Sequence, residues 1–204
     1  NEQLVNKKAT GCSVACGFVF SQEFTGKKYS DKDYVRYMYA AFFGREPDTE
    51  GSNYWISQLT SGTSREMVFA GFTNSKEFAD LCEECGIVRG YYLPGFEPQK
   101  TAQVSLFVER LYNVILDRNC DTAGMEHWTT QLCTLAESGS QVAFGFVFSD
   151  EFKAKHLCNS HYVEVLYEAF MGRASDEGGK SHWLNQLSSG VSREDVFNGF
   201  ACSQ

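Results

Sequence analysis

The stretch GREPDTEGSNYWISQL, Gly44 to Leu59, decides the fold because its skeleton occurs three times in a chain of 204 residues. The pattern R-x-x-D-x-x-G-x-x-x-W-x-x-Q-L keeps the same spacing in every copy. Its conserved positions are Arg45, Asp48, Gly51 and Trp55 in the first copy, Arg118, Asp121, Gly124 and Trp128 in the second, and Arg173, Asp176, Gly179 and Trp183 in the third. Such a repeat is typical of an array of similar structural units.

A second marker, V-x-x-G-F, occurs once more than the first and sets the boundaries of the units. Its copies are Val14 to Phe18, Val68 to Phe72, Val142 to Phe146 and Val196 to Phe200. The sequence therefore predicts that the fragment comes from a longer multidomain chain and divides as follows: 1–24, the tail (third helix) of a preceding repeat; 33–78, repeat 1; 79–104, an inserted linker rich in cysteine and aromatic residues; 105–152, repeat 2; and 159–204, repeat 3.

Three helices are expected in each repeat. Apolar residues spaced i, i+3, i+4 and i+7, as in Val35, Met38, Tyr39 and Phe42, predict the first helix. The motif Asp should cap the second helix and pair with the preceding Arg. Gly51 and Trp55 are four residues apart, so they should share one face of that helix. The third helix should begin after a hydroxyl cap at Thr10, Ser64, Ser138 and Ser192. The predicted fold is all-α, with tandem three-helix units packed as a helical array.

A glycine inside the third helix needs a reason, because glycine costs a helix about 1 kcal/mol relative to alanine. Its recurrence at Gly17, Gly71, Gly145 and Gly199 indicates that another backbone packs closely there.

Composition limits the classes of partner. The formal net charge of -8 disfavours nucleic acid and anionic membrane surfaces. No apolar run approaches the roughly 20 residues of a membrane-spanning helix, and the N-terminal residues do not resemble a signal peptide. Phosphate-binding loops, G-x-S-x-G and H-E-x-x-H are absent from the sequence. We therefore expect a non-catalytic protein without cofactor or metal.

Eight cysteines predict an oxidising compartment and disulfides, namely among Cys12, Cys16, Cys82, Cys85, Cys120, Cys133, Cys158 and Cys202, with the connectivity left open. Cys82 and Cys85 form a C-x-x-C, but without a second such pair they indicate neither a zinc ribbon nor a redox motif. The segment HLCNSH, with His156, Cys158 and His161, would need a fourth ligand to close a zinc site.

The stretch from Tyr34 to Phe78, with its R-x-x-D-x-x-G-x-x-x-W, G-F and S-x-E-F elements, resembles the bacterial repeat family catalogued as domain of unknown function 4214. The resemblance covers nearly the whole chain outside the insertion. It implies an accessory module of secreted or cell-surface bacterial proteins, and it carries no catalytic residues. The insertion, the cysteines and the Ala174–Ser175 pair depart from the plain pattern.

Two functions remain open at this point. In the first, the chain binds glycan or protein ligands, as in adhesion, through the rings of Tyr54, His127 and His182 and the insertion residues Tyr91, Tyr92 and Phe96. In the second, it is a structural spacer that orders neighbouring domains. Exposed, clustered aromatic residues would favour binding, whereas buried ones would favour the spacer. The aromatic residues of the insertion also allow two interpretations: they recognise a ligand, or they cover an edge between repeats.

Overall fold

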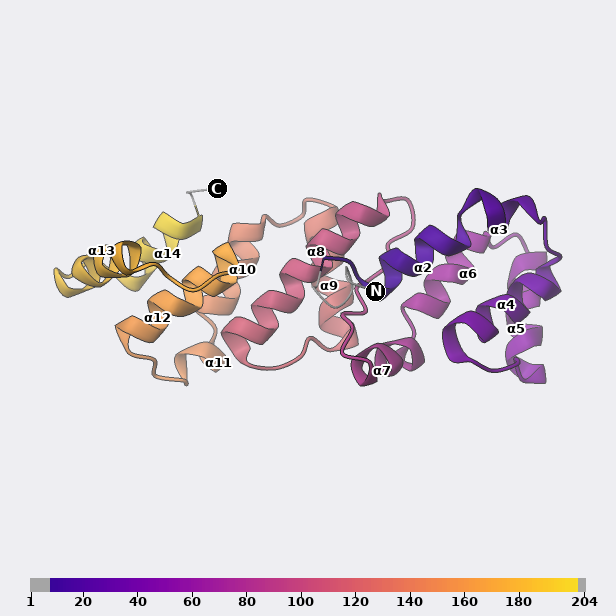
Figure 1. Cartoon of the computed structure of the whole chain (residues 1–204), viewed down its shortest axis with the longest axis horizontal. Helices are drawn as coiled ribbons and strands as arrows, with labels where there is room; N and C mark the ends of the chain where they lie inside the picture. Colours follow the sequence, from indigo (N-terminus) through magenta and orange to yellow (C-terminus); the bar gives the residue numbers. More distant parts are fainter. Residues whose placement is uncertain (1–7, 202–204) are drawn as a thin grey trace. The chain divides into compact units, whose positions relative to one another are not determined.

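A computed structural model describes residues 8–201, and every regular element among them is a helix (Figure 1). The described residues before repeat 1 form α2 (Gly11–Val19) and α3 (Gln22–Gly26). Repeat 1 forms α4 (Asp31–Phe43), α5 (Thr49–Thr60), α6 (Arg65–Thr73) and α7 (Lys76–Glu84). The all-α repeat array expected from the sequence is confirmed.

The later repeats keep this order of helices. Repeat 2 consists of α8 (Pro98–Leu111), which continues into the π-helical turn η1 (Tyr112–Leu116), then α9 (Thr122–Cys133), α10 (Gly139–Val147) and α11 (Asp150–Lys153). Repeat 3 consists of α12 (Asn159–Leu166) with the π-helical turn η2 (Tyr167–Met171), then α13 (Glu177–Ser188) and α14 (Arg193–Ala201).

A short helix follows the third helix, so the expectation of three helices per repeat was incomplete. The helices α3, α7 and α11 start at Ser21, Ser75 and Ser149, whose hydroxyls accept a backbone N–H at 3.1 to 3.2 Å. These serines open the S-x-E-F element, which therefore encodes a helix start. The fourth helix matters because its Glu contacts the motif Arg.

Hydroxyl caps begin the third helices as the sequence predicts. Ser64 and Ser192 accept the N–H of Met67 and Asp195. Thr10 caps α2, and Ser138 forms the predicted capping box with Gln141.

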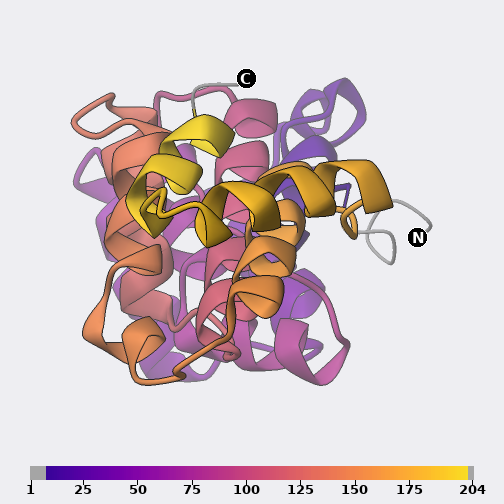
Figure 2. The same cartoon turned by 90° about the vertical axis from the view of Figure 1, so that its left-hand side faces the viewer.

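The described chain divides into two compact units that do not coincide with the sequence repeats. The first contains residues up to Phe107 together with Asp121–Cys133, and the second contains Val108–Cys120 together with Thr134 onwards. In the first unit α4 packs against α5, α6 and α7. In the second, α13 packs against α12 and α14, which Figure 2 shows at the yellow end of the chain.

Aromatic rings fill the core of each unit. In the first, the buried Phe69 and Phe72 meet Phe42 at ring distances of 5.7 and 6.0 Å. In the second, the buried Phe197 and Phe200 meet Phe170 at 5.4 and 6.3 Å. Equivalent positions thus build equivalent cores, which is why the repeat is visible in the sequence.

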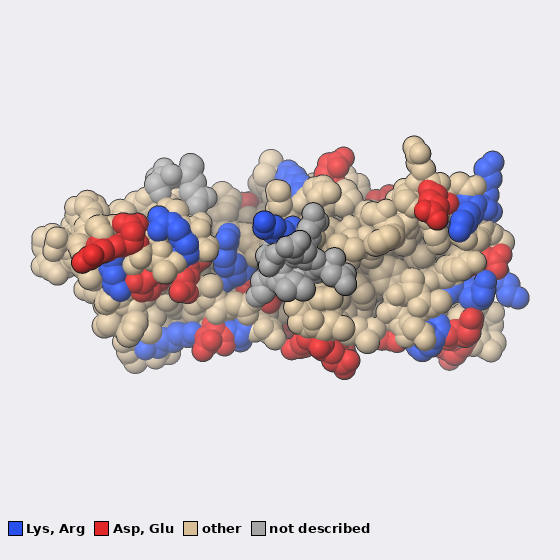
Figure 3. All heavy atoms as spheres, viewed as in Figure 1, with Lys and Arg blue, Asp and Glu red and all other residues tan. Residues whose placement is uncertain are grey.

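The described residues include no helix of the length and hydropathy that a membrane span requires. Acidic and basic side chains are interspersed on the face that Figure 3 shows.

Candidate functional site

The motif Asp caps the second helix in all three repeats. The Oδ1 atoms of Asp48, Asp121 and Asp176 accept the N–H of the motif Gly at 2.7, 2.7 and 2.8 Å. This backbone hydrogen bond holds the pKa of Asp48 and of Asp176 below the usual range of a carboxyl group, and the neighbouring Arg acts in the same direction. The capping role predicted from the sequence is confirmed.

In repeats 1 and 2 the motif Arg binds a Glu that the sequence analysis did not pair with it, whereas repeat 3 shows the predicted pair with the motif Asp. Arg45 lies 3.7 Å from Asp48, but it donates two hydrogen bonds to Glu77 on α7, at 3.2 and 3.1 Å. Arg118 binds Glu151 on α11 in the same way, at 2.8 and 3.3 Å. In repeat 3, Arg173 lies 3.4 Å from Asp176. The Glu of S-x-E-F was the missed signal, because it follows the Phe of V-x-x-G-F at the same distance in repeats 1 and 2.

Each motif Arg also lies over a tyrosine ring of the first helix. The guanidinium carbons of Arg45, Arg118 and Arg173 are 5.0, 4.7 and 5.4 Å from the ring centres of Tyr39, Tyr112 and Tyr167. Such cation–π contacts add a modest stabilisation at partly exposed sites.

Four of the recurring glycines make room for aromatic side chains, whereas a Cβ at Gly17 or Gly145 would meet nothing within 4 Å. A Cβ at Gly51 would overlap the Tyr39 hydroxyl, and one at Gly179 would overlap the hydroxyl of Tyr167. In the third helices, a Cβ at Gly71 or Gly199 would overlap the indole of Trp55 or Trp183. The expectation of a close backbone at these helices was therefore wrong, since the neighbour is a flat ring.

Of the predicted binding residues, three point outward next to the motif tryptophans. Tyr54, His127 and His182 are exposed, and their rings meet Trp55, Trp128 and Trp183 edge to face at 4.9, 4.6 and 5.0 Å. Tyr54 is 55% exposed. Each of the three rings belongs to a different repeat and contacts the Trp of that repeat.

The insertion is part of the fold of the first compact unit. Tyr92 is buried, its ring lies 4.8 Å from Phe69, and its hydroxyl donates to Glu66 at 3.0 Å. The N–H of Tyr91 donates to Ser105 at 3.1 Å, and burial raises the pKa of Tyr91 to about 12. Phe96 is half-buried in a turn. The insertion thus covers an edge of the core, as the second alternative expected.

The disulfide prediction is corrected. Cys12, Cys16, Cys82, Cys85, Cys133 and Cys158 are free thiols, while Cys202 lies outside the described residues. Cys120 is half-buried just before α9. Burial raises the pKa of Cys12 to about 12 and that of Cys82 to about 11, so both are neutral thiols at physiological pH. They pack as small apolar side chains. The number of cysteines in a sequence does not distinguish such buried thiols from disulfide-bonded cysteines. Extracellular location stays a prediction from the family resemblance.

The histidine and cysteine segment does not assemble a closed metal site. Cys158 Sγ lies 3.4 Å from His161 Nδ1. Among residues 8–201, no three side chains of His, Cys, Asp or Glu converge as metal ligands.

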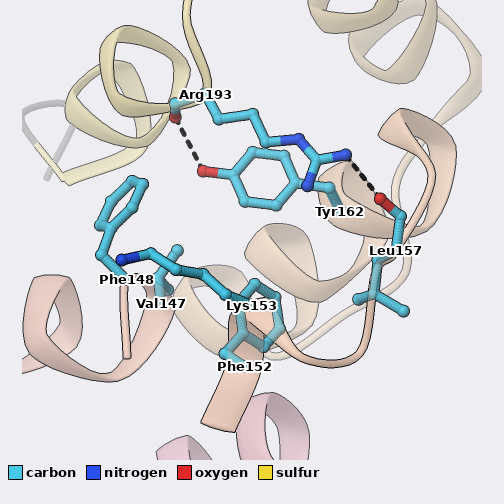
Figure 4. A pocket seen from close by; sticks show the side chains of 7 residues that line it. All are labelled: Val147, Phe148, Phe152, Lys153, Leu157, Tyr162 and Arg193. Carbon is cyan, nitrogen blue, oxygen red and sulfur yellow. Dashed lines mark hydrogen bonds between the residues drawn. The ribbon is translucent and has the colours of Figure 1, made fainter. Parts of the chain in front are cut away.

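A pocket that the sequence did not reveal lies in the second compact unit. It measures about 200 Å³ and is lined by the ends of α10 and α11, by α12 and the residue Leu157 before it, and by the start of α14 (Figure 4). Val147, Phe148, Phe152, Lys153, Leu157, Tyr162 and Arg193 line it.

Comparison with known families is consistent with this architecture. The model of the domain of unknown function DUF4214 matches residues 15–82, 96–156 and 147–204. Comparisons with curated proteins and with solved structures gave no significant match. The matched segments contain the Arg, Asp, Gly and Trp residues of the motif R-x-x-D-x-x-G-x-x-x-W, which we call the corner motif, and they cover most of the chain. The chain therefore belongs to the DUF4214 family, of which it carries three repeated segments.

Proposed function

We propose that the chain is a non-catalytic structural repeat module that holds and orders neighbouring parts of a larger bacterial surface protein. One observation carries this proposal: the repeated residues find their partners inside the fold. In repeat 1, Asp48 caps α5, Arg45 binds Glu77, Gly51 admits the Tyr39 hydroxyl and Trp55 covers Gly71. Residues with such partners hold the helices of one repeat together. Repeats that share these contacts form an array along the chain.

The insertion supports the same function. Tyr92 and Arg89 are buried, and the Arg89 guanidinium donates to the carbonyl oxygens of Gly90 and Asn74 at 2.9 and 3.0 Å. A segment that differs from its neighbours was the best candidate for ligand recognition. Its polar and aromatic groups instead bind the first compact unit, which favours the spacer over the recognition loop.

Substitution of Asp48 tests whether the motif is structural. Asp48→Ala should lower the melting temperature because the Gly51 N–H loses its acceptor, whereas Asp48→Asn, which keeps an acceptor oxygen, should lower it less. Thermal denaturation followed by circular dichroism measures both. An Asp48→Ala protein that melts like the wild type would contradict a structural role for the motif.

The ordering role itself can be measured by single-molecule energy transfer between dyes at positions 8 and 201 of the intact chain. A scaffold should give one narrow distance distribution that added ligands do not change. A broad distribution, or one that shifts when a glycan is added, would contradict the scaffold.

A second candidate function is ligand binding by the outward rings, favoured by the exposure of Tyr54, His127 and His182 beside half-buried tryptophans. Aromatic pairs of this kind suit sugar faces. A glycan array probed with the chain and with a variant carrying alanine at all three positions tests it. Binding by the wild type that the variant loses would support this function, and equal signals would exclude it.

A further inference from the structure

The pocket of the second compact unit combines an apolar interior with two cations. The rings of Phe148, Phe152 and Tyr162 and the side chain of Leu157 supply the apolar lining, and Lys153 and Arg193 supply positive charge. Figure 4 shows the Arg193 guanidinium lying over the Tyr162 ring, at 4.7 Å, while the Lys153 chain extends beside Phe148. No acidic residue is among the seven that line the pocket.

In the first compact unit, the residues at the equivalent positions are aromatic and their rings pack together. The motifs align Phe152, Leu157 and Val165 with Phe24, Tyr29 and Tyr37. There the Tyr29 ring lies 4.4 Å from Tyr37 and 5.2 Å from Phe24, and the Tyr37 ring lies 6.1 Å from Phe24. In the second unit, Leu157 and Val165 are smaller than the tyrosines that they replace. Of these two residues Leu157 lines the pocket, so a smaller side chain stands there than in the first unit.

The charged residues at this place also differ between the two compact units. Arg65, the counterpart of Arg193, binds the Asp31 carboxylate at 2.8 Å. In the second unit that position is Asn159, whose Oδ1 accepts from Arg193 at 2.9 and 3.2 Å but carries no charge. Lys153 also replaces Thr25. The second unit has therefore gained one cation here and lost the anion that neutralises the other.

The fold fixes Arg193 but leaves part of it available. Its Nη2 atom donates to the Leu157 carbonyl at 2.6 Å, and the Tyr162 hydroxyl donates to the Arg193 carbonyl at 2.7 Å (Figure 4). Between residues 8 and 201, the Arg193 Nη1 group and the Lys153 ammonium have no protein acceptor, since Arg193 donates through Nε and Nη2 alone. The nearby acids Glu194 and Asp195 on α14 do not line the pocket, and Asp195 accepts the Ser192 hydroxyl at 2.6 Å.

We propose that this pocket binds a small carboxylate with an apolar body, of the aryl or branched-alkyl acid class. The apolar body packs against Phe148, Phe152 and Leu157, and the carboxylate accepts hydrogen bonds from Arg193 Nη1 and Lys153 Nζ. Guanidinium and ammonium groups suit a carboxylate, and an apolar pocket with few polar groups is the common form of a small-molecule site. This proposal is independent of the scaffold function, which involves the corner motif.

Benzoate is the probe, titrated into the intact 15N-labelled chain and followed by the backbone amide resonances of the pocket-lining residues. Benzoate should shift these resonances saturably, whereas benzyl alcohol, which keeps the ring without the charge, should bind at least about tenfold more weakly. Equal affinity for the two compounds, or no shift of the lining residues, would overturn the proposal.

Three variants of the second unit sharpen the test. Leu157→Tyr restores a ring at the position of Tyr29 and should abolish benzoate binding. Asn159→Asp restores the Arg193 counterion, and Lys153→Gln removes the other cation; each should weaken binding by roughly tenfold. Circular dichroism verifies that each variant is folded. Wild-type affinity in either charge variant would contradict the carboxylate site.

The first compact unit provides a matched control. Thr25→Lys places a lysine at the position equivalent to Lys153, where Tyr29 and Tyr37 fill the space. This variant should show no benzoate-dependent shift around Phe24. A shift there would mean that a surface lysine alone attracts benzoate, and it would overturn the assignment of a built pocket.

Discussion

At the scale of single residues, a tyrosine and an arginine tie the first helix of a repeat to its third. The Tyr34 hydroxyl donates to the Arg65 carbonyl at 2.9 Å, and the Arg65 guanidinium lies 4.8 Å from the Tyr34 ring centre. Tyr162 and Arg193 repeat both contacts in repeat 3. In repeat 2 the motifs place Phe107 and Gly139 at these positions, so the hydroxyl and the guanidinium are both missing.

Tyr34→Phe tests this contact. The change should lower the free energy of unfolding by about 1 kcal/mol because it leaves the Arg65 carbonyl without its donor. Tyr162→Phe removes the equivalent hydrogen bond to the Arg193 carbonyl, and it should give a comparable loss. Urea denaturation measures both. An unchanged midpoint for Tyr34→Phe would show that the hydroxyl does not stabilise the first compact unit.

At the scale of elements, the same glycine position has different surroundings in two helices. In α6 a Cβ at Gly71 would overlap the Trp55 indole, whereas in α2 a Cβ at Gly17 would meet nothing within 4 Å. Gly71→Ala should therefore destabilise the chain by roughly 1 kcal/mol through overpacking. Gly17→Ala should stabilise it by about 0.5–1 kcal/mol through helix propensity. Changes of the same sign in chemical denaturation would contradict this difference.

The insertion is an element that the first compact unit needs. Tyr92→Ala removes a buried ring and should lower the free energy of unfolding by about 3 kcal/mol. Tyr92→Phe keeps the ring but removes the hydroxyl and its hydrogen bond to Glu66, and it should cost about 1 kcal/mol. Denaturant titration separates the two. A Tyr92→Ala protein of wild-type stability would mean that the insertion is dispensable and would reopen recognition as its role.

At the scale of the whole molecule, stability should decline in acid. Lys180 and Ser175 donate to Glu164 and lower its pKa to about 2, and Arg118 lowers the pKa of Glu151. Asp48 and Asp176 have lowered pKa values as well. The folded-state pKa values lie below those of the unfolded chain, which are about 4. Between these values the unfolded state binds more protons, so the stability present above about pH 4.5 is lost as the pH falls towards 2.

Melting temperatures between pH 7 and pH 2.5 measure this dependence. Glu164→Gln should lower the melting temperature at pH 7 and make its decline in acid shallower. A variant with the same acid slope as the wild type would mean that other carboxylates cause the decline.

The repeat motif was predictable because its physics is local. Asp48 and Ser138 cap helices within a few residues of their own positions, and apolar spacing marks one face of a helix. The partners of Arg45 and Tyr34 were not predictable in this way, because Glu77 and Arg65 lie a whole helix or more away. The pocket could not be predicted for a related reason, since it depends on how Leu157, which stands in the place of Tyr29, meets side chains from other helices.

The sequence by itself determined the family, the helical class and the order of the three main helices of each repeat, because caps, spacing and repetition act over short distances along the chain. Only the tertiary structure decided what the cysteines and the insertion do. Six cysteines are free thiols, most of them buried, and Tyr92 lies in the core. Composition counts such residues but does not place them. Burial and pairing depend on which distant side chains surround a residue, and folding alone brings those side chains together.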